Sequence, residues 1–396
     1  MPEVIFPVDP EKSRFDQALY PHNRWHPEIP AVASVRPGAT FRVECLDWTD
    51  GQVEDDDDAS DVADIDLSVV HVLSGPIRVE GAEPGDLLVV DILDLGPFPG
   101  HSWGFTGIFA RSNGGGFLTE EFPDAAKAIW DLSGIWASSR QVPGVRFPGL
   151  AHPGLIGCAP SQRLLDTWNA REAALVAQAP QRVPPLANLP EPRNAILGSL
   201  GPAAGAFKRV AAEAARTVPP REHGGNVDIK NLSKGSRVYF PVYVRGANLS
   251  VGDLHFSQGD GEISFCGAIE MAGWIDLHVD LIKGGMATYS IVDNPVFQTG
   301  PVEPRFSRYL IFEGISVDRD GTQLYLDAHV AYRNACINAV RYLQGCGYSG
   351  EQAYLLISAA PCEGRVSGIV DIPNACCTLA LPTEIFATSI LPGERT

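Results

Sequence analysis

The sequence predicts a mainly β protein, α+β overall, in which antiparallel β-sandwich or barrel lobes carry peripheral helices and a C-terminal helical or αβ segment. Glycine (40 residues) and proline (32 residues) exceed their usual shares of a 396-residue chain, which indicates many turns. Short runs rich in Val, Ile and Leu are closely spaced and separated by Pro and Gly, as in antiparallel sheets. Stretches with helical spacing of apolar residues are few.

The elements begin after a polar, Pro-rich arm over residues 1–40. Its aromatic residues fit packing on another lobe or subunit, and we expect a homo-oligomer. Ser349 is suited to be a helix N-cap, and Glu351 would lie in the first turn of that helix. The spacing of apolar residues predicts strands over 41–46, 69–73, 77–80, 87–95, 237–244 and 274–283, and helices over 164–179, 203–217, 329–343 and 349–359.

These elements divide the chain into three parts. Residues 1–160 form an N-terminal β lobe with the extended arm, and residues 161–222 form a helical insert or connection. Residues 223–396 form a β-rich catalytic lobe with C-terminal helices. A chain of this length has room for two or three such units at roughly 100–200 residues each.

Composition and charge narrow the class of protein. Hydrophobic residues make up 45% and charged residues 20% of the chain, which suits a globular protein with a substantial core. The net charge of −18 argues against nucleic-acid and anionic-membrane partners and suits an enzyme that acts on a neutral molecule. We find no signal peptide or apolar run near the ~20 residues that span a bilayer. Eight scattered cysteines without a CxxC pair indicate reduced thiols, so we expect a cytoplasmic protein.

The stretch Glu222–Met271 concentrates the groups that carry chemistry. Asp253 and His255 are two residues apart, so on an extended chain both point to one face. Asp260 and Glu262 repeat this spacing, and the glycines around them let the backbone turn sharply near a ligand. Turns with solvated carboxylates would produce the same short pieces. Carboxylates and an imidazole that converge from strand ends predict a metal site or an acid–base site.

The same stretch carries a family resemblance. The run GGNVDIKNLSKGSRVYFPVYV, followed by GDLHFSQGDGE and CGAIEMAGW, resembles the acetamidase/formamidase family, and most closely its long, formamidase-type branch. Nearly the whole chain shares the likeness, in order: HNRW (22–25), SGPIRVEGAEPGDLLVVDILD (74–94), WGFTGIFARSNGGGFLTEEFPDA (103–125), HPGLIG (152–157) and IPNACCTLALPTEIF (372–386). The resemblance implies hydrolysis of a small aliphatic amide, formamide above all and acetamide as a further substrate, to the carboxylic acid and ammonia.

Our first mechanistic hypothesis is a metal-activated water. A divalent ion, zinc in the first place with calcium or magnesium as alternatives, would be held by the set Asp228, His255, Asp260 and Glu262. The ion would polarise the amide carbonyl and lower the pKa of a bound water. Glu262 or Asp253 would take the proton of that water, with His255 as a further catalytic group.

The substrate would be held by polar groups. Formamide offers almost no apolar surface, so a small site must rely on placed hydrogen bonds. Asn226 and Gln258 are the candidates from the central stretch. His71 is a third, because its HVLSGP segment is similar to a pattern in shorter members of the family. His152, in the HPGLIG segment, is a further candidate.

Three alternatives stand beside the metal hypothesis. Cys266 would be the nucleophile of a covalent amidase, with Lys230 as an oxyanion partner, although a lone cysteine beside Phe265 also fits an apolar core position. A β-rich protein that binds a small ligand without turnover is the second. The third is a rival site on residues 274–283, where three polar side chains alternate on one face, as they also do on a half-exposed sheet.

Overall fold

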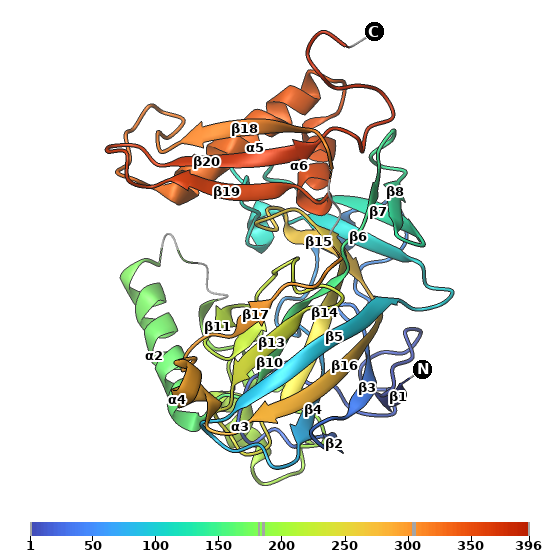
Figure 1. Cartoon of the computed structure of the whole chain (residues 1–396), viewed down its shortest axis with the longest axis vertical. Coiled ribbons are helices and arrows are strands. Elements are labelled where there is room, and N and C mark those ends of the chain that lie inside the picture. Colours follow the sequence, from blue (N-terminus) through green and yellow to red (C-terminus); the bar gives the residue numbers. More distant parts are fainter. Residues whose placement is uncertain (1, 181–182, 184–186, 303–305, 395–396) are drawn as a thin grey trace.

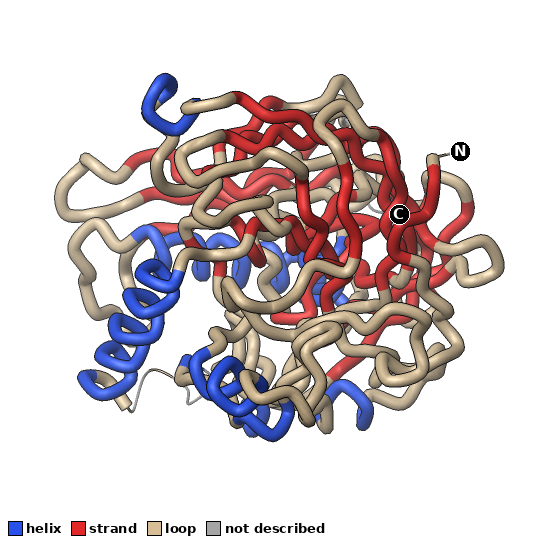
Figure 2. The backbone as a smooth tube through the Cα atoms, turned by 90° about the horizontal axis from the view of Figure 1, so that it is seen from below, coloured by secondary structure: helices blue, strands red, loops and turns tan. Residues whose placement is uncertain are grey.

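A computed structural model describes residues 2–180, 183, 187–302 and 306–394. Strands take up 33% and helices 17% of the structure, with several antiparallel sheets, which confirms the mainly β class. Figure 1 shows a large β-rich body below and a smaller lobe, coloured orange and red, above it. Seen from below, strands and long loops dominate the body (Figure 2).

The first sheet is built around two long antiparallel strands. β16 pairs with both β5 and β3, and it buries Ile275, Leu277 and Val279 on one face. The strand order of this sheet is β1 (Glu3–Phe6), β3 (Thr40–Cys45), β16 (Gly273–Ile282), β5 (Leu87–Pro97), β13 (Arg237–Pro241) and β17 (Val296–Gln298).

The second sheet is larger, and β14 lies at its centre. All ten residues of β14 are buried, because β10, β15 and β4 all pair with it and the sheet is covered on both faces. β2 (Ala33–Val35) joins through β4 (Leu73–Val79). The main order is β11 (Pro220–Arg221), β12 (Gly224–Asn226), β10 (His152–Cys158), β14 (Leu249–Gln258), β15 (Phe265–Met271), β6 (Trp103–Ile108), β7 (Ala126–Ser133), β8 (Trp136–Ser139) and β9 (Arg146–Pro148).

The C-terminal lobe has its own small sheet and the two predicted helices. Its strands are β18 (Tyr309–Ile315), β20 (Cys376–Pro382) and β19 (Glu363–Gly368), and its helices are α5 (Ala328–Gln344) and α6 (Gly350–Ala359). As predicted, Ser349 caps α6, and it forms a capping box with Gln352. α5 lies against the sheet, and α6 packs toward β15 and β6 of the body.

The remaining helices are short or peripheral. They are α1 (Ser60–Ala63), α2 (Gln162–Gln178), α3 (Phe207–Glu213), α4 (Gly285–Tyr289) and the 3-10 turns η1 (Arg111–Asn113) and η3 (Pro192–Asn194). The helix expected over 164–179 is α2, whereas only 207–213 of the stretch 203–217 is helical. Among the described residues, no helix combines the length and the apolar character needed to cross a bilayer.

One expectation from the sequence differs from the structure. Residues 69–72 form a loop instead of a strand, because the amide of His71 donates to the Thr217 hydroxyl (2.6 Å) and not to a neighbouring strand. The N-terminal arm packs on its own chain, where Trp25 is buried and bridges to Ala215. Both large sheets also draw strands from either side of the insert over 161–222, so the first and third parts of the expected division share them.

Candidate active site

A buried imidazole on the central strand lies between two carboxylates. His255 Nε2 is 3.0 Å from Glu270 Oε2 and 3.3 Å from Asp253 Oδ1, and all three side chains are almost wholly buried. Glu270 is the residue opposite His255 in the β14–β15 ladder, so strand pairing places these two groups together. Burial alone would lower the pKa of His255, but Glu270 and Asp253 outweigh it and hold the pKa well above its usual value.

The other side of the His255 ring is held by hydrogen bonds. Its Nδ1 lies 3.0 Å from Gln258 Oε1 and 3.3 Å from His152 Nε2. The Gln258 amide nitrogen donates to the Asp228 carbonyl (2.7 Å), so its oxygen faces His255 and can only accept. Nδ1 therefore carries the proton, and in a neutral ring the Nε2 lone pair points at the carboxylates. Beyond these ion-pair contacts, His255 Nε2 and Glu270 Oε2 make no hydrogen bond within the described part of the chain.

Two more carboxylates complete the cluster. Ligand atoms of Asp228, His255 and Glu262 lie within 4.8 Å of one another, as do those of Asp253, His255 and Glu270. Burial raises the pKa of Asp228 to about 6 and that of Glu270 to about 8, and it raises the pKa of Glu262 well above its usual value. Two buried acids, Asp253 and Glu270, and two partly buried ones, Asp228 and Glu262, surround one imidazole and favour bound cations, either protons or a metal ion. The cluster could therefore hold a metal ion.

These acids sit on strained backbone. Asp228 (φ 46°), Asp253 (φ 54°) and Glu262 (φ 46°) all adopt the left-handed region, which residues other than glycine enter uncommonly. Such conformations persist where the surrounding structure fixes them, and they are frequent at functional sites. The strain turns the three carboxylates toward the same space.

That space is a cavity of about 250 Å³. The amide nitrogen of Asn226 donates to the Val218 carbonyl (3.1 Å), and its amide oxygen has no hydrogen-bond partner in the described structure. The His71 ring packs against Trp48 with centroids 5.0 Å apart. The wall thus combines apolar and acidic groups, and its residues are Trp48, Leu67, Val70, His71, Phe109, Val218, Asn226, Asp228, Asp253, Gly261, Glu262, Phe265 and Glu270.

Two residues of the expected site take other places, and one site residue was missed. The Asp260 carboxylate pairs with Lys230 Nζ (3.0 Å) and accepts from the Gly364 amide (2.8 Å), which directs it away from the His255 cluster. Gln258 lies behind His255 and is not among the residues that line the cavity. Glu270 is the missed residue, and the signal was an acid inside the apolar run CGAIEMA of a strand that the fold must bury.

Comparison with known proteins identifies the family of this chain. The profile of the acetamidase/formamidase family matches residues 7–388. The chain belongs to the acetamidase/formamidase family. It is 61% identical to a formamidase of Methylophilus methylotrophus over 391 residues, covering 99% of this chain and 95% of that one. An acetamidase of Mycolicibacterium smegmatis is 60% identical over 373 residues, covering 92% and 91%.

One solved structure is similar to this chain in both fold and sequence. A gamma lactamase from Delftia acidovorans has a TM-score of 0.96 and 59% identity, covering 98% of this chain and 95% of that chain. The expected family resemblance is confirmed, and with it the expectation of an amide hydrolase of the formamidase/acetamidase type.

The structure argues against the two other sites that the sequence left open, the nucleophile Cys266 and the polar face of residues 274–283. Cys266 is buried in an apolar cluster with Trp48 and Phe105, and burial raises the pKa of its thiol well above the usual value, so it is a poor nucleophile. In β16, Asp276 forms an ion pair with Arg42 (2.6 Å). His278 Nδ1 lies 3.3 Å from Asp91 Oδ2, so two of the three polar side chains are paired with neighbours on this sheet face.

Proposed function

We propose that this protein hydrolyses formamide, and other short aliphatic amides such as acetamide, to the carboxylic acid and ammonia. The relatives named formamidase and acetamidase support this substrate class. The observation that carries the proposal is the cluster at His255. Its ring nitrogen lies 3.0 Å from an oxygen of Glu270, which lines the cavity, and beyond its ion-pair contacts neither atom makes a hydrogen bond among the described residues.

We assign Asp253, His255 and Glu270 as the residues that would hold a divalent ion, with Asp228 as a further oxygen donor. One imidazole nitrogen with carboxylate oxygens is a donor set that suits zinc first, whereas calcium and magnesium prefer oxygen alone. Such an ion, when bound, supplies polarisation of the amide carbonyl and lowers the pKa of water. Gln258 orients His255, because it accepts the Nδ1 proton and leaves Nε2 for coordination.

Glu262 is the residue that we assign to proton transfer. Burial, reinforced by Asp228, holds the pKa of Glu262 well above its usual value. Burial would also raise the pKa of Asp253, but His255 overcomes this effect and lowers it. When the pKa values of two neighbouring acids differ in this way, the acid with the raised pKa, here Glu262, suits proton transfer, and the acid with the lowered pKa, here Asp253, stays an anion. Glu262 would take a proton from the attacking water and return it to the leaving nitrogen as ammonia departs.

Asn226 is assigned to the substrate. Its free amide oxygen faces the cavity and would accept an N–H of the substrate amide. His71 lines the same cavity, where burial lowers the pKa of its ring, so a neutral imidazole would be available to the substrate. A site that hydrogen-bonds both the N–H and the carbonyl oxygen of an amide discriminates against molecules that lack either group.

The test is ammonia release from formamide by purified protein, before and after dialysis against a chelator, with metal content measured in parallel. We expect activity to disappear with the metal and to return when zinc is added back. Full activity in metal-free protein would refute the metal assignment. No ammonia under either condition would refute formamide as the substrate. Light scattering of the same sample would test the predicted homo-oligomer.

A second candidate substrate class is the γ-lactam. The cavity of about 250 Å³ has room for a molecule larger than formamide, and Trp48, Phe109 and Phe265 give it an apolar wall. The similar structure named gamma lactamase supports this alternative. Comparison of kcat/KM for formamide, acetamide and an unsubstituted γ-lactam separates the two. A lactam preferred over formamide by more than about tenfold, or 1.4 kcal/mol, would favour the second class.

A further inference from the structure

The loop between β14 and β15 presents the proposed proton carrier to the cavity. Within residues 259–265, Gly261 (φ 96°), Glu262 (φ 46°) and Phe265 (φ 88°) all have positive φ. Glutamate and phenylalanine rarely adopt this backbone, so the loop must be fixed by contacts outside itself. Gly261 and Glu262 line the active-site cavity, so the conformation of the loop decides where the Glu262 carboxylate lies.

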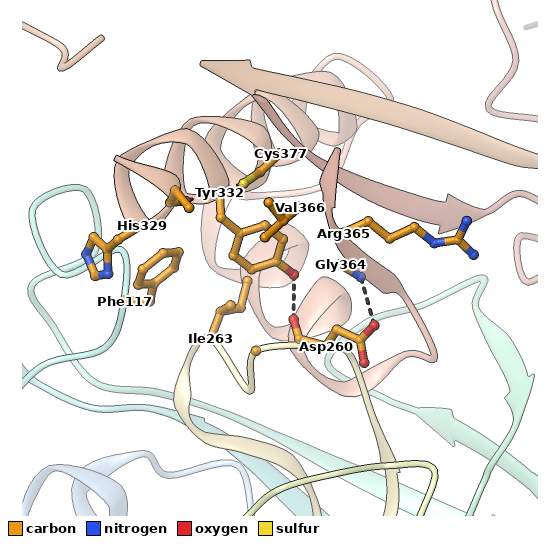
Figure 3. A pocket seen from close by; sticks show the side chains of 11 residues that line it. Phe117, Asp260, Ile263, His329, Tyr332, Gly364, Arg365, Val366 and Cys377 are labelled. Atoms are coloured by element: carbon orange, nitrogen blue, oxygen red, sulfur yellow. Dashed lines mark hydrogen bonds between the residues drawn. The ribbon is translucent and has the colours of Figure 1, made fainter. Parts of the chain in front are cut away.

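The contacts that fix this loop converge on Asp260. Its carbonyl accepts from the Tyr332 hydroxyl (2.5 Å), and its carboxylate accepts from the Gly364 amide (2.8 Å), as Figure 3 shows. The carboxylate also pairs with Lys230 (3.0 Å), and the Asp260 amide donates to the Cys362 carbonyl (3.1 Å). Tyr332 lies on α5, and Gly364 lies on β19. Most of these partners therefore belong to the C-terminal lobe.

Further bonds tie the two ends of the loop to α6. The Gly259 amide donates to the Ser358 carbonyl (2.6 Å), and the Ser264 amide donates to the Ser358 hydroxyl (3.1 Å). The Tyr354 hydroxyl donates to the Ile263 carbonyl. Four of the seven residues over 259–265 are therefore bonded to the lobe, and they hold the chain on both sides of Gly261 and Glu262, where φ is positive.

Lys230 connects the loop to a second acid of the cluster. It lies two residues after Asp228, and its Nζ binds both Asp260 and the Cys362 carbonyl (2.6 Å). The pair between Lys230 and Asp260 thus joins the two segments that carry Asp228 and Glu262. The Lys230 side chain is only 7% exposed, whereas that of Asp260 is 36% exposed, so solvent screens this ion pair in part.

The other side of the loop faces a second cavity of about 430 Å³ in the C-terminal lobe. Gly261 lines both cavities, and the Tyr332 ring in Figure 3 stands directly against this part of the chain. A Cβ on Gly261 would lie 3.0 Å from that ring. The loop is therefore a thin wall between the active site and the lobe, with little freedom to shift without moving Glu262.

We propose that the C-terminal lobe is a positioning element for the active site. Asp260, Lys230 and Tyr332 are positioning residues that hold the 259–265 loop in its strained form and keep the Glu262 carboxylate in the cavity. The inference rests on the proposed role of Glu262 in amide hydrolysis. It gives Asp260 a function different from the metal ligand that its spacing to Glu262 predicts.

The chain offers a matched pair of substitutions to test this. Tyr332→Phe removes the hydroxyl bonded to Asp260, whereas Tyr342→Phe, on the same helix, removes a hydroxyl that donates to the Ile390 carbonyl and lies away from the loop. A small misplacement of a catalytic group can cost about 100-fold, so we expect Tyr332→Phe to lower kcat at least ~tenfold, with KM changed less than about twofold. Tyr342→Phe should change kcat less than about twofold. Amide hydrogen exchange over 259–265 should accelerate only in Tyr332→Phe.

A double-mutant cycle with Glu262→Gln identifies the residue through which Tyr332 acts. Once the carboxylate is gone, Tyr332→Phe should lower kcat by less than about twofold further. Equal kcat in Tyr332→Phe and Tyr342→Phe, beside a Glu262→Gln variant with strongly lowered but measurable kcat, would overturn the positioning proposal alone. An undiminished effect of Tyr332→Phe in the Glu262→Gln background would do the same. Wild-type activity in Glu262→Gln would overturn the proposed role of Glu262 itself.

Discussion

Replacement of Gln258 by leucine distinguishes two roles for this residue. The structure indicates that it orients His255, whereas the sequence predicts that it binds the substrate. The structure places its amide between the Asp228 carbonyl and His255 Nδ1, at 2.7 and 3.0 Å. The substitution removes the principal acceptor of the Nδ1 proton and leaves the ring free to turn. A hydrogen bond to a charged group contributes about 1.5–3 kcal/mol, which corresponds to roughly tenfold to a hundredfold in affinity for a metal ion. Losses of this size are usual for residues that orient a ligating histidine.

The assay is competition with a metal-binding chromophore, followed by kinetics on metal-saturated protein. We expect weaker metal binding in Gln258→Leu and a KM for formamide close to that of the wild type. Gln298→Leu, an exposed change on β17, is the control for the loss of a glutamine. Unchanged metal affinity together with a raised KM would refute the reasoning and return Gln258 to the substrate-binding group.

Three further predictions follow from the same geometry. Asn226→Ala should raise KM for formamide about tenfold, because one hydrogen bond contributes about 1 kcal/mol or slightly more, and an unchanged KM would contradict its assignment. Cys266→Ala should keep kcat within about threefold while lowering the free energy of unfolding by about 1 kcal/mol, and an inactive but folded variant would revive the covalent mechanism. Metal affinity should fall as pH decreases below 8, because protons on Glu270 (pKa about 8) and on His255 (pKa well above its usual value) compete with the ion. The fall should reach up to about tenfold per pH unit for each displaced proton. Binding that does not change from pH 6 to 8 would argue against Glu270 as a ligand.

Local patterns in the sequence account for much of the fold. The helices α2, α5 and α6 could be predicted because apolar spacing and capping residues act within a few turns of chain, as Ser349 illustrates. The loop over 69–72 could not, because the Thr217 hydroxyl that holds the amide of His71 is 146 residues away. The partner of the arm could not be named from the sequence for a similar reason, since Ala215 lies far along the chain from Trp25.

The sequence by itself determined the family, the mainly β class and the segment that carries the site. It also placed Asp228, Asp253, His255 and Glu262 among the candidates. Tertiary structure alone decided which groups meet. Pairing of β14 with β15 sets Glu270 against His255, whereas the C-terminal lobe draws Asp260 toward Lys230 and away from the cluster. Spacing along a strand fixes the direction of a side chain, but only strand register and lobe packing fix what it faces.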